Sequence, residues 1–588
     1  MRDKRQETRD KRQETRDIIY GLRVFVKRVA PLIIPLTLIL FGSLLLLIYP
    51  VQSLLIAAGE NFIVHRQLNA PVWHERFIRW SFTGIALNCI FYISLLLINI
   101  DKKFSGYYGR FFLLSFLICI TSCLSPFGLK AMDPDTTVYL TIAQGITEGR
   151  VPFKDFYDNK GPLLYLISAP GFALGRFTGV WITELLFMFV SMIFAFKTAL
   201  FFGKRKEAFA GVTLSFIIFQ TFFYEVAGTE EYVLPFMTIS LYIFTKYYFC
   251  AKKIVFSELV VLGFCFASAV FLRINFFSLW LGFCVCIFIE TIINRDFKNL
   301  VKYTAGFLTG ITLITAPVLI YLIGNNAFFD YIQQNFITGS SRGLSGFNIA
   351  EFIKSFFMIT GKNFCFIPML AAFVWIVKNK DDKKKGYYYA YLLAFILTVS
   401  FHAAIRSNFD HYNMVLTPFL VPAFTCFVQH IKAYFSNYKH RILYLTIFFL
   451  ILLSPQLVKY YAAFINSVGN KSRMNHIIAG KIIDENTSKN DKIISLGFQC
   501  CIYLFTERRS ASRYIYQISG VDYEPKAHEE FLNDLYHNKP AVIIIRLNYE
   551  NLYDYLPAWY TPVYDLIERD YELLSDKYDF ALFKKRRK

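Results

Sequence analysis

The feature that most constrains this chain is a series of long apolar runs separated by short polar segments. A helix needs about 20 residues to cross the hydrocarbon core of a bilayer, and about thirteen runs approach that length. Because lipid offers no partners for backbone N–H and C=O groups, each crossing run is expected to be a helix. The runs lie near residues 30–49, 80–100, 111–131, 181–202, 208–227, 232–249, 254–273, 276–293, 301–323, 364–377, 387–405, 412–430 and 441–456.

The composition supports a membrane protein over a soluble one. Hydrophobic residues make up 55% and charged residues 18% of the 588, which leaves too few polar side chains to cover a water-exposed globule of this size. The net charge of +20 raises nucleic acid as a partner. The basic residues, however, lie in short clusters between apolar runs, as the positive-inside rule requires. We therefore expect membrane lipid, and no nucleic acid, as a partner.

The basic clusters also predict the orientation. With the N-terminus in the cytoplasm, the clusters all face the cytoplasm, provided that the apolar stretch 162–177 lies along the interface instead of crossing. These clusters are Lys102/Lys103/Arg110, Lys204/Arg205/Lys206, Lys252/Lys253, Arg295/Lys298/Lys302, Lys378 to Lys385, and Lys432/Lys439/Arg441. The prediction is a multi-pass protein of the plasma (inner) membrane.

Three domains follow from this pattern. Residues 1–29 contain RDKRQET twice in tandem and read as a basic cytosolic tail. Residues 30–456 form the helical membrane domain, with outward segments at 132–180, 228–231, 324–363 and 406–411. After residue 457 the runs become short and β-rich, as in 493–498 and 541–547, which predicts a small extracytoplasmic α/β domain at 457–588. The fold class is thus all-α polytopic with a C-terminal α/β domain.

The outward segment 133–165 carries the first candidate residues for chemistry. Carboxylates at the mouth of an apolar bundle are costly unless they are solvated or used, which makes Asp133 and Asp135 candidates for a site. They have a simpler interpretation as caps of the helix that follows, because aspartate is a good N-cap. Lys160 is either a functional cation or a lysine that reaches to the interface.

The same segment resembles the GT-C glycosyltransferases, in the branch that contains the family 39 protein O-mannosyltransferases and the lipid A aminoarabinose transferase. The resemblance covers roughly residues 111–456, and the two additional N-terminal spans depart from it. Three fragments carry it in order: Asp135 with Tyr139; Gly149, Pro152, Phe153 and Asp155; and Lys160, Gly161, Pro162, Leu163 and Tyr165.

The resemblance implies transfer of a sugar, with inversion, from a polyprenyl-phosphate donor to an extracytoplasmic glycan, glycolipid or protein acceptor. Such a reaction needs a base for the acceptor hydroxyl and cations for the phosphate. By the family pattern, Asp135 is the base and Lys160 binds the donor phosphate. Arg406 and His411 in the turn RSNFDHY are further phosphate-binding candidates, and His411 alternatively is a solvated interfacial side chain.

Two further outer positions remain open. Glu230 and Glu231 in GTEEY, with Asp133 and Tyr139, are candidates for orienting the acceptor or an ion, or the two glutamates simply form a solvated turn. Arg273 ends a span and either contacts the donor phosphate or, as we favour, reaches to the interface. The cluster Arg508, Arg509 and Arg513 is expected to be a solvated surface.

Other functions and cofactors stay possible at this point. A transporter or flippase of lipid-linked sugars would carry charges buried within spans. A polysaccharide ligase or polymerase would place its key polar residues in a late outer loop such as 324–363. The sequence specifies neither the sugar nor the acceptor, and the pair Asp133 and Asp135 is too small to specify the divalent cation that it could hold.

Overall fold

The computed structural model describes most of the chain from residue 105 onward. The described residues are 105–127, 132–220, 222–223, 227–250, 253–338, 348–362, 364–378, 382–404, 409–434, 473–497, 499–517, 521, 525–546, 560–578 and 580–586. The expected tail at 1–29, the spans at 30–49, 80–100 and 441–456, and Arg406 lie outside them. The chain divides into two compact units, 1–116 and 117–588. The start of helix α5 (Ser105–Cys119) belongs to the first unit, and the other described elements belong to the second.

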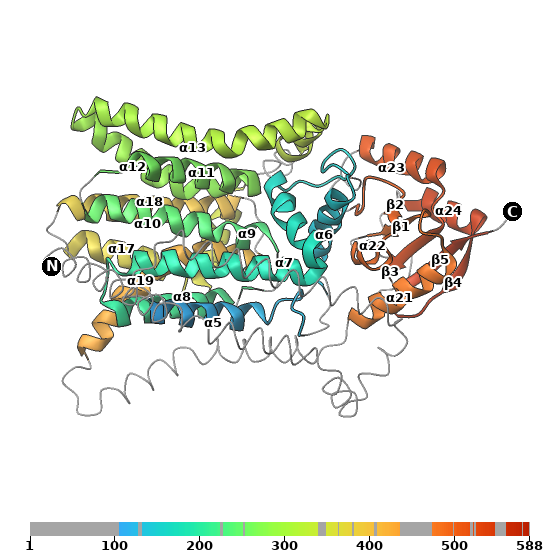
Figure 1. The fold of residues 1–588 in the computed structure, drawn as a ribbon, viewed down its shortest axis with the longest axis horizontal. Coiled ribbons are helices and arrows are strands. Elements are labelled where there is room, and N and C mark those ends of the chain that lie inside the picture. Colours follow the sequence, from blue (N-terminus) through green and yellow to red (C-terminus); the bar gives the residue numbers. More distant parts are fainter. Residues whose placement is uncertain are drawn as a thin grey trace, which may run out of the picture. The chain divides into compact units, whose positions relative to one another are not determined.

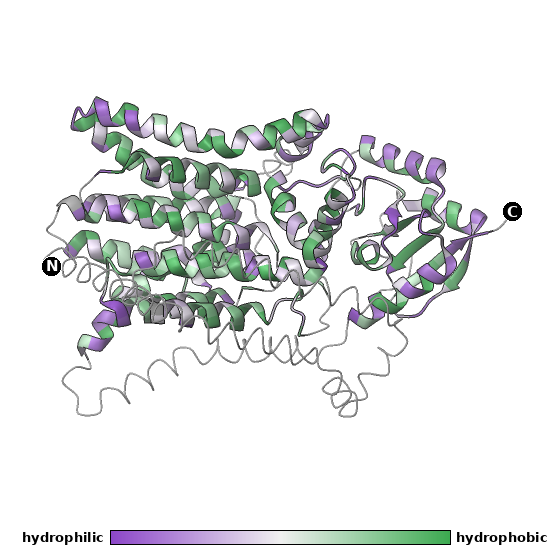
Figure 2. Cartoon of the chain, viewed as in Figure 1, coloured by the Kyte–Doolittle hydropathy of each residue, from purple (hydrophilic) through white to green (hydrophobic). Residues whose placement is uncertain are grey.

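The second unit contains a bundle of apolar helices, several of which run side by side in Figure 1. By length and composition, five described helical segments can cross a membrane. Figure 2 shows that hydrophobic residues predominate along the helices of the bundle. These are Pro162–Ala199, Ile274–Ile293, Phe297–Gly324, Lys384–Ala404 and Asp410–Tyr434. The apolar helices Gly106–Cys119, Phe256–Leu272 and Ile367–Lys378 are shorter.

The helices of the bundle and its connections follow the expected runs with local differences. Helix α5 ends well before residue 131 and α8 before residue 227, where the sequence predicts the spans to end. In chain order the elements are α6 (Pro134–Thr147), α7 (Pro162–Ala199), α8 (Arg205–Gln220), α9 (Thr229–Tyr232), α10 (Leu234–Phe249), α11 (Phe256–Leu272), the 3-10 helix η2 (Ile274–Phe277), α12 (Ser278–Ile293), α13 (Phe297–Gly324), α14 (Phe328–Ile332), the π-helix η3 (Gln333–Thr338), α16 (Ile349–Gly361), α17 (Ile367–Lys378), α18 (Asp382–Ala404), the 3-10 helix η4 (Asp410–Leu416) and α19 (Thr417–Tyr434).

Helix α7 is broken near its first third. Gly175 and Arg176 leave the helical conformation, with φ of −158° and 50° respectively, and separate residues 162–174 from 177–199. Gly171 and Gly179 meet across this break so closely that a Cβ on Gly179 would lie 1.9 Å from the Gly171 carbonyl oxygen. The break falls near the boundary that the basic clusters predict between an interfacial helix and a span. The interfacial position of 162–177 itself stays a prediction.

A mixed five-stranded sheet forms the C-terminal region, in the order β2-β1-β3-β5-β4. Strand β1 is parallel to β2 and β3, and β5 is antiparallel to β3 and β4. Two strands coincide with the β-rich runs in the sequence, and helices alternate with the strands. The elements are α21 (Arg473–Asn486), β1 (Lys492–Leu496), α22 (Cys501–Thr506), β2 (Arg509–Ser510), α23 (Pro525–Asn538), β3 (Val542–Arg546), α24 (Thr561–Asp570), β4 (Tyr571–Ser575) and β5 (Phe580–Lys585).

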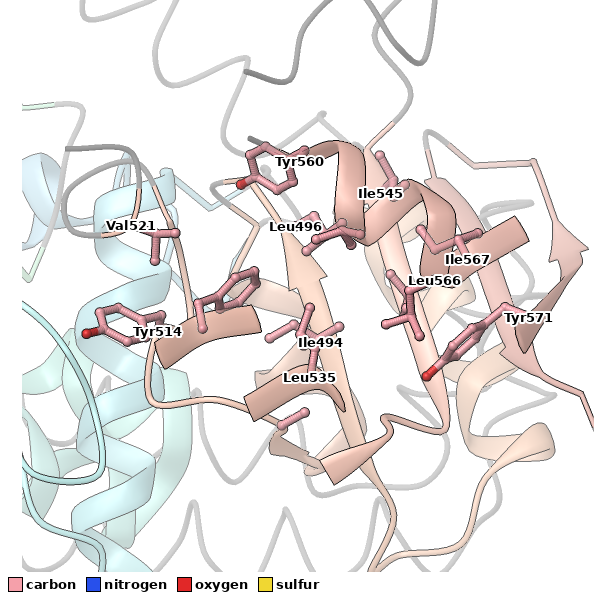
Figure 3. Packing of buried hydrophobic residues seen from close by; sticks show 14 of the residues in the cluster. Ile494, Leu496, Tyr514, Val521, Leu535, Ile545, Tyr560, Leu566, Ile567 and Tyr571 are labelled. Atoms are coloured by element: carbon pink, nitrogen blue, oxygen red, sulfur yellow. The ribbon is translucent and has the colours of Figure 1, made fainter. Parts of the chain in front are cut away.

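One face of the sheet packs against helices α23 and α24 to form a core of its own. Figure 3 shows Ile494 of β1 and Ile545 of β3 among the side chains of Leu535, Leu566 and Ile567 from these helices. Burial of such side chains stabilises each by about 1.5–3 kcal/mol relative to exposure. The core extends to Tyr157 of the outer segment, so the sheet region and the loop that carries Lys160 share buried surface.

Helices α11 and α13 cross with their backbones in direct contact. A Cβ on Gly263 would lie 1.9 Å from the Phe307 carbonyl oxygen, and a Cβ on Gly310 would lie 1.9 Å from that of Val260. Small residues permit such approaches between membrane helices, where packing and not water exclusion drives association. The crossing lies in the first half of α11, and Arg273 follows the other end of the same helix.

We predict that Gly310→Ala destabilises the protein, because the added methyl group separates α11 from α13. Overpacking of this kind costs about 1–3 kcal/mol. The melting temperature of the purified protein in detergent measures the effect. Gly324→Ala on the same helix is the matched control, since nothing lies within 4 Å of its Cβ position. An equal response of the two variants would contradict the proposed crossing.

Candidate functional site

The two aspartates at the start of α6 have different environments. Asp133 is the N-cap, and its carboxylate accepts from the backbone N–H groups of Asp135 at 3.0 Å and Thr136 at 3.4 Å. The simpler interpretation is therefore right for Asp133. Asp135 lies in the first helical turn, where a carboxylate is favoured by the helix dipole, and is partly exposed.

Lys160 lies against the same helix. Its ammonium group is 5.8 Å from the centre of the Tyr139 ring and donates to Asn159 Oδ1 at 3.1 Å. Burial acts to lower the pKa of Lys160, but the carboxylates of Asp135 and then Asp158 outweigh it and raise the pKa above its ordinary value. The structure therefore brings Asp135, Tyr139 and Lys160 together, with Lys160 kept cationic by its neighbours.

Gly161 fixes where this lysine stands relative to the bundle. Its N–H donates to the Leu272 carbonyl at 3.0 Å, and a Cβ at this position would lie 1.9 Å from the Phe271 carbonyl oxygen. No side chain fits there, so glycine allows the loop to rest on the last residues of α11. The next residue after α11 is Arg273, and the contact places Lys160 beside it.

Arg273 is partly buried, with a side chain 16% exposed, and it is paired with a carboxylate, where the sequence favoured a side chain that reaches to the interface. Its guanidinium forms an ion pair with Glu230 and lies 4.4 Å from the centre of the Tyr412 ring. Burial acts to lower the pKa of Arg273, and Tyr412 and Glu230 outweigh that effect and raise it. Arg273 is thus a second cation beside Lys160. The sequence alone favours the interface for Arg273 over a contact with the donor phosphate.

Glu230 is the carboxylate that balances this cation. It is 4% exposed and accepts from the Thr229 hydroxyl at 2.6 Å, so the interpretation as a solvated turn is wrong. Burial acts to raise the pKa of Glu230, but Arg273 and His411 outweigh burial and lower the pKa to about 2. The group is an anion at every physiological pH.

Glu231 points into a different environment from its neighbour. Its carboxylate accepts from the Ala227 N–H at 3.0 Å and lies near Glu184, a fully buried residue of α7 that accepts from the Ser122 hydroxyl at 3.0 Å. Burial raises the pKa of Glu231. The adjacent glutamates therefore separate: Glu230 joins the cations, and Glu231 faces a second carboxylate inside the bundle.

The turn at η4, which the sequence predicts to face outward, brings His411 and Tyr412 to the same cluster. His411 lies in η4 and is 4% exposed, so it is not the solvated side chain of the alternative interpretation. Its ring centre is 4.3 Å from that of Tyr412, and the Tyr412 ring also meets Arg273. Arg406, three residues before the described part of this turn, lies outside the described residues.

Asp158 is a site residue that the sequence analysis missed. It is 2% exposed, and its carboxylate accepts from the hydroxyl groups of Tyr165 at 2.5 Å and Tyr516 at 2.7 Å. Its position in the segment YDNKGP was a signal, because a carboxylate two residues from a functional lysine is a natural counter-charge. Tyr516 had no such signal, since it lies 358 residues away.

The arginines of the C-terminal region are also more engaged than expected. Arg508 is buried and donates to the Thr506 carbonyl at 2.7 Å. Arg513 pairs with Asp330 at 3.2 Å and Glu530 at 2.9 Å. These two residues are structural partners and not a solvated surface, while Arg509 is exposed as expected.

The arrangement suits chemistry at a phosphorylated leaving group. A partly exposed carboxylate, Asp135, stands beside two cations, Lys160 and Arg273, at one end of the apolar bundle. Lysine binds phosphate as a point charge and arginine as a fork of donors. Among the residues that the structure describes, no three His, Cys, Asp or Glu side chains are grouped to hold a metal ion.

Comparison with solved structures identifies the fold. The crystal structure of ArnT from Cupriavidus metallidurans bound to undecaprenyl phosphate matches with a TM-score of 0.54 and 12% identity, over 82% of this chain and 98% of that one. The apo state of the same protein matches with a TM-score of 0.52, 12% identity and the same shares of both chains. ArnT is the lipid A aminoarabinose transferase, so the resemblance to GT-C proteins is confirmed for the fold.

The sequence itself matches a family model. No curated protein matches the chain significantly. The family model described as "Putative competence-induced protein Ccs4 N-terminal domain" matches residues 100–442, which cover every cluster residue named above except Tyr516. This match spans more than half of the chain, and the protein belongs to that family.

Proposed function

We propose that the protein is an integral membrane glycosyltransferase that moves a sugar from a polyprenyl-phosphate donor to an extracytoplasmic acceptor with inversion. One observation carries the proposal: Asp135 lies within electrostatic reach of Lys160, and Lys160 stands beside the Arg273–Glu230 pair. The structure of ArnT with undecaprenyl phosphate supports the donor class, because that protein shares the fold. The sugar and the acceptor, whether glycan, glycolipid or protein, remain to be assigned by experiment.

In this mechanism Asp135 accepts the proton of the acceptor hydroxyl. The hydroxyl oxygen attacks the anomeric carbon from the side opposite the phosphate, and the bond between that carbon and the phosphate oxygen breaks. Proton transfer to a positioned base contributes about 10²–10⁴-fold to such a step. The first turn of α6 suits this role, because Asp133 already caps the helix and Asp135 is not needed as the cap.

Negative charge grows on the phosphate as the bond breaks, and cations fixed in advance stabilise it. Lys160 and Arg273 supply these charges. Glu230 and Tyr412 hold the Arg273 guanidinium in place, and His411 completes the group as a further donor toward the leaving phosphate. Tyr139 lies between Asp135 and Lys160 and borders the position of the sugar.

The proposal also places the site relative to the membrane. The polyprenyl chain is soluble only in lipid, so its phosphate presents the sugar at the membrane surface. We place the cluster and the C-terminal domain on the extracytoplasmic side of the plasma (inner) membrane and the N-terminus in the cytoplasm, as the distribution of basic residues requires.

Asp135→Asn is expected to abolish sugar transfer while the protein stays folded, because an amide cannot accept the proton. The assay supplies the purified protein with a series of radiolabelled polyprenyl-phosphate sugars and follows the label from the lipid to the acceptor. Asp133→Asn is the matched control. Asparagine caps helices as well as aspartate does, so this variant should retain activity. Turnover by Asp135→Asn at the wild-type rate would remove the proposed base.

Arg273→Gln is expected to destabilise the protein, since it leaves Glu230 as a buried unpaired anion, at a cost of about 3–5 kcal/mol. The double variant Arg273→Gln/Glu230→Gln should regain stability, because two amides can bond to each other. It should nevertheless bind undecaprenyl phosphate weakly, because the cation is gone. Thermal unfolding and native mass spectrometry of the lipid complex measure the two effects. Full binding by the double variant would restrict Arg273 to a structural role.

A further inference from the structure

The loop that carries Lys160 is held through Asp158. This buried carboxylate receives three hydrogen bonds: from the Tyr165 hydroxyl at 2.5 Å, the Tyr516 hydroxyl at 2.7 Å and the Asn159 N–H at 2.7 Å. A buried carboxylate is stable only when donors or charges compensate for lost water. Asp158 also contributes to the charge around Lys160, so its position and that of the lysine are linked.

Two of the donors are local, and the third comes from a distant part of the chain. Tyr165 belongs to the first turn of α7, Asn159 to the loop itself, and Tyr516 to the segment between β2 and α23 of the C-terminal domain. The Tyr516 hydroxyl is thus a direct contact of the C-terminal domain with the lysine loop. The two residues of the Tyr516–Asp158 bond are 358 positions apart.

A second set of hydrogen bonds holds the backbone of the same loop. The Asp158 N–H donates to Gln334 Oε1 at 3.1 Å, and Gln334 Nε2 donates to the Phe153 carbonyl at 2.7 Å. In its favoured amide orientation Asn335 donates to the carbonyl groups of Asn159 at 3.0 Å and Lys160 at 3.1 Å. Both side chains belong to the π-helix η3, an element that occurs mostly at functional sites.

The C-terminal segment is also anchored just before Tyr516, through Arg513 and Tyr514. The Tyr157 N–H donates to the Arg513 carbonyl at 2.9 Å, and the Tyr157 and Tyr514 rings lie 5.1 Å apart. Arg513 reaches Asp330, just before the π-helix, at 3.2 Å. The contact of Tyr516 with Asp158 is therefore held by a rigid frame and is not an isolated surface bond.

We propose that Asp158, held by Tyr516 of the C-terminal domain and Tyr165 of α7, is a positioning residue that fixes Lys160 toward the donor phosphate. The C-terminal domain is then part of the donor site, and not only a platform for the acceptor. This inference rests on the proposed function, because it assigns the phosphate to Lys160. It adds a residue, Tyr516, that lies outside the part of the chain matched by the family model.

The direct test is the affinity of the purified full-length protein for undecaprenyl phosphate. Tyr516→Phe keeps the ring and removes the hydroxyl from Asp158. A hydrogen bond to a charged group is worth about tenfold to a hundredfold in an equilibrium, so we expect weakening in that range. In transfer assays the KM for the donor should rise by a similar factor, and kcat should fall as well, because Lys160 also stabilises the charge that grows on the phosphate as the bond breaks.

Tyr514→Phe is the matched control in the same segment. Its hydroxyl donates to Glu530 at 3.0 Å and its ring packs on Tyr157, which phenylalanine preserves. This variant should bind the lipid as the wild type does. Equal weakening by both variants would overturn the proposal, since it would show that domain docking in general matters and the Asp158 bond does not.

Asp158→Asn provides a second route to the same point. It should weaken lipid binding at least as much as Tyr516→Phe, because it also removes the charge that Tyr165 and Asn159 stabilise. The losses in the double variant should be less than additive, because both changes act on the bond between Tyr516 and Asp158. Additive losses would overturn the proposal. If the wild-type protein neither binds undecaprenyl phosphate nor transfers any sugar, the proposed function is refuted. If the wild type is active and Tyr516→Phe binds the lipid with the same affinity, only the positioning role is refuted.

Discussion

The burial of charge at the end of the bundle is the constraint on which the site depends. Glu230 is removed from water and Arg273 is partly so, with side chains 6% and 16% exposed, and each compensates the charge of the other. Their pairing fixes the guanidinium, and Tyr412 stacks against it from the second outer turn. The ion pair therefore joins two outer turns and the end of α11 into one structure. A phosphate approaching this group meets a cation whose position is already determined, which is the condition for effective electrostatic stabilisation.

Close backbone contacts bring the remaining cation to that pair. Gly161 rests on the Phe271 and Leu272 carbonyl groups, and α11 in turn crosses α13 through Gly263 and Gly310. Each contact excludes a Cβ, so the glycines determine how near the elements approach. The chain of contacts runs from the packing of two membrane helices to the spacing of Lys160 and Arg273. Packing within the bundle and chemistry at its end are thus consequences of the same small residues.

The sequence predicts the helices and several site residues of this protein better than the contacts between side chains from different segments. Apolar runs predict most of the described helices, since length and hydropathy alone decide whether a helix can cross lipid. The family pattern that segment 133–165 resembles points to Asp135, Tyr139 and Lys160, three members of the cluster that lie within one segment of the chain. The burial of Glu230 and Arg273 was not predictable, because an exposed turn and a buried ion pair have the same local sequence. Tyr516 was beyond reach for a similar reason: its partner is set by docking of a separate domain.

The neighbouring glutamates of α9 show how the fold divides residues that the sequence treats alike. Glu230 faces Arg273 and His411 and is held as an anion, whereas Glu231 faces Glu184 and its pKa is raised by burial. A helix of four residues directs consecutive side chains to opposite surroundings, and only one of these surroundings contains a cation. The acidic character of the turn thus serves two purposes. One carboxylate orients the guanidinium that the proposed reaction uses, and the other lies within the bundle beside a second carboxylate, where the two negative charges disfavour each other. The site is therefore defined by the charged side chains that the fold brings into contact. Two residues that are adjacent in the chain need not belong to the same site.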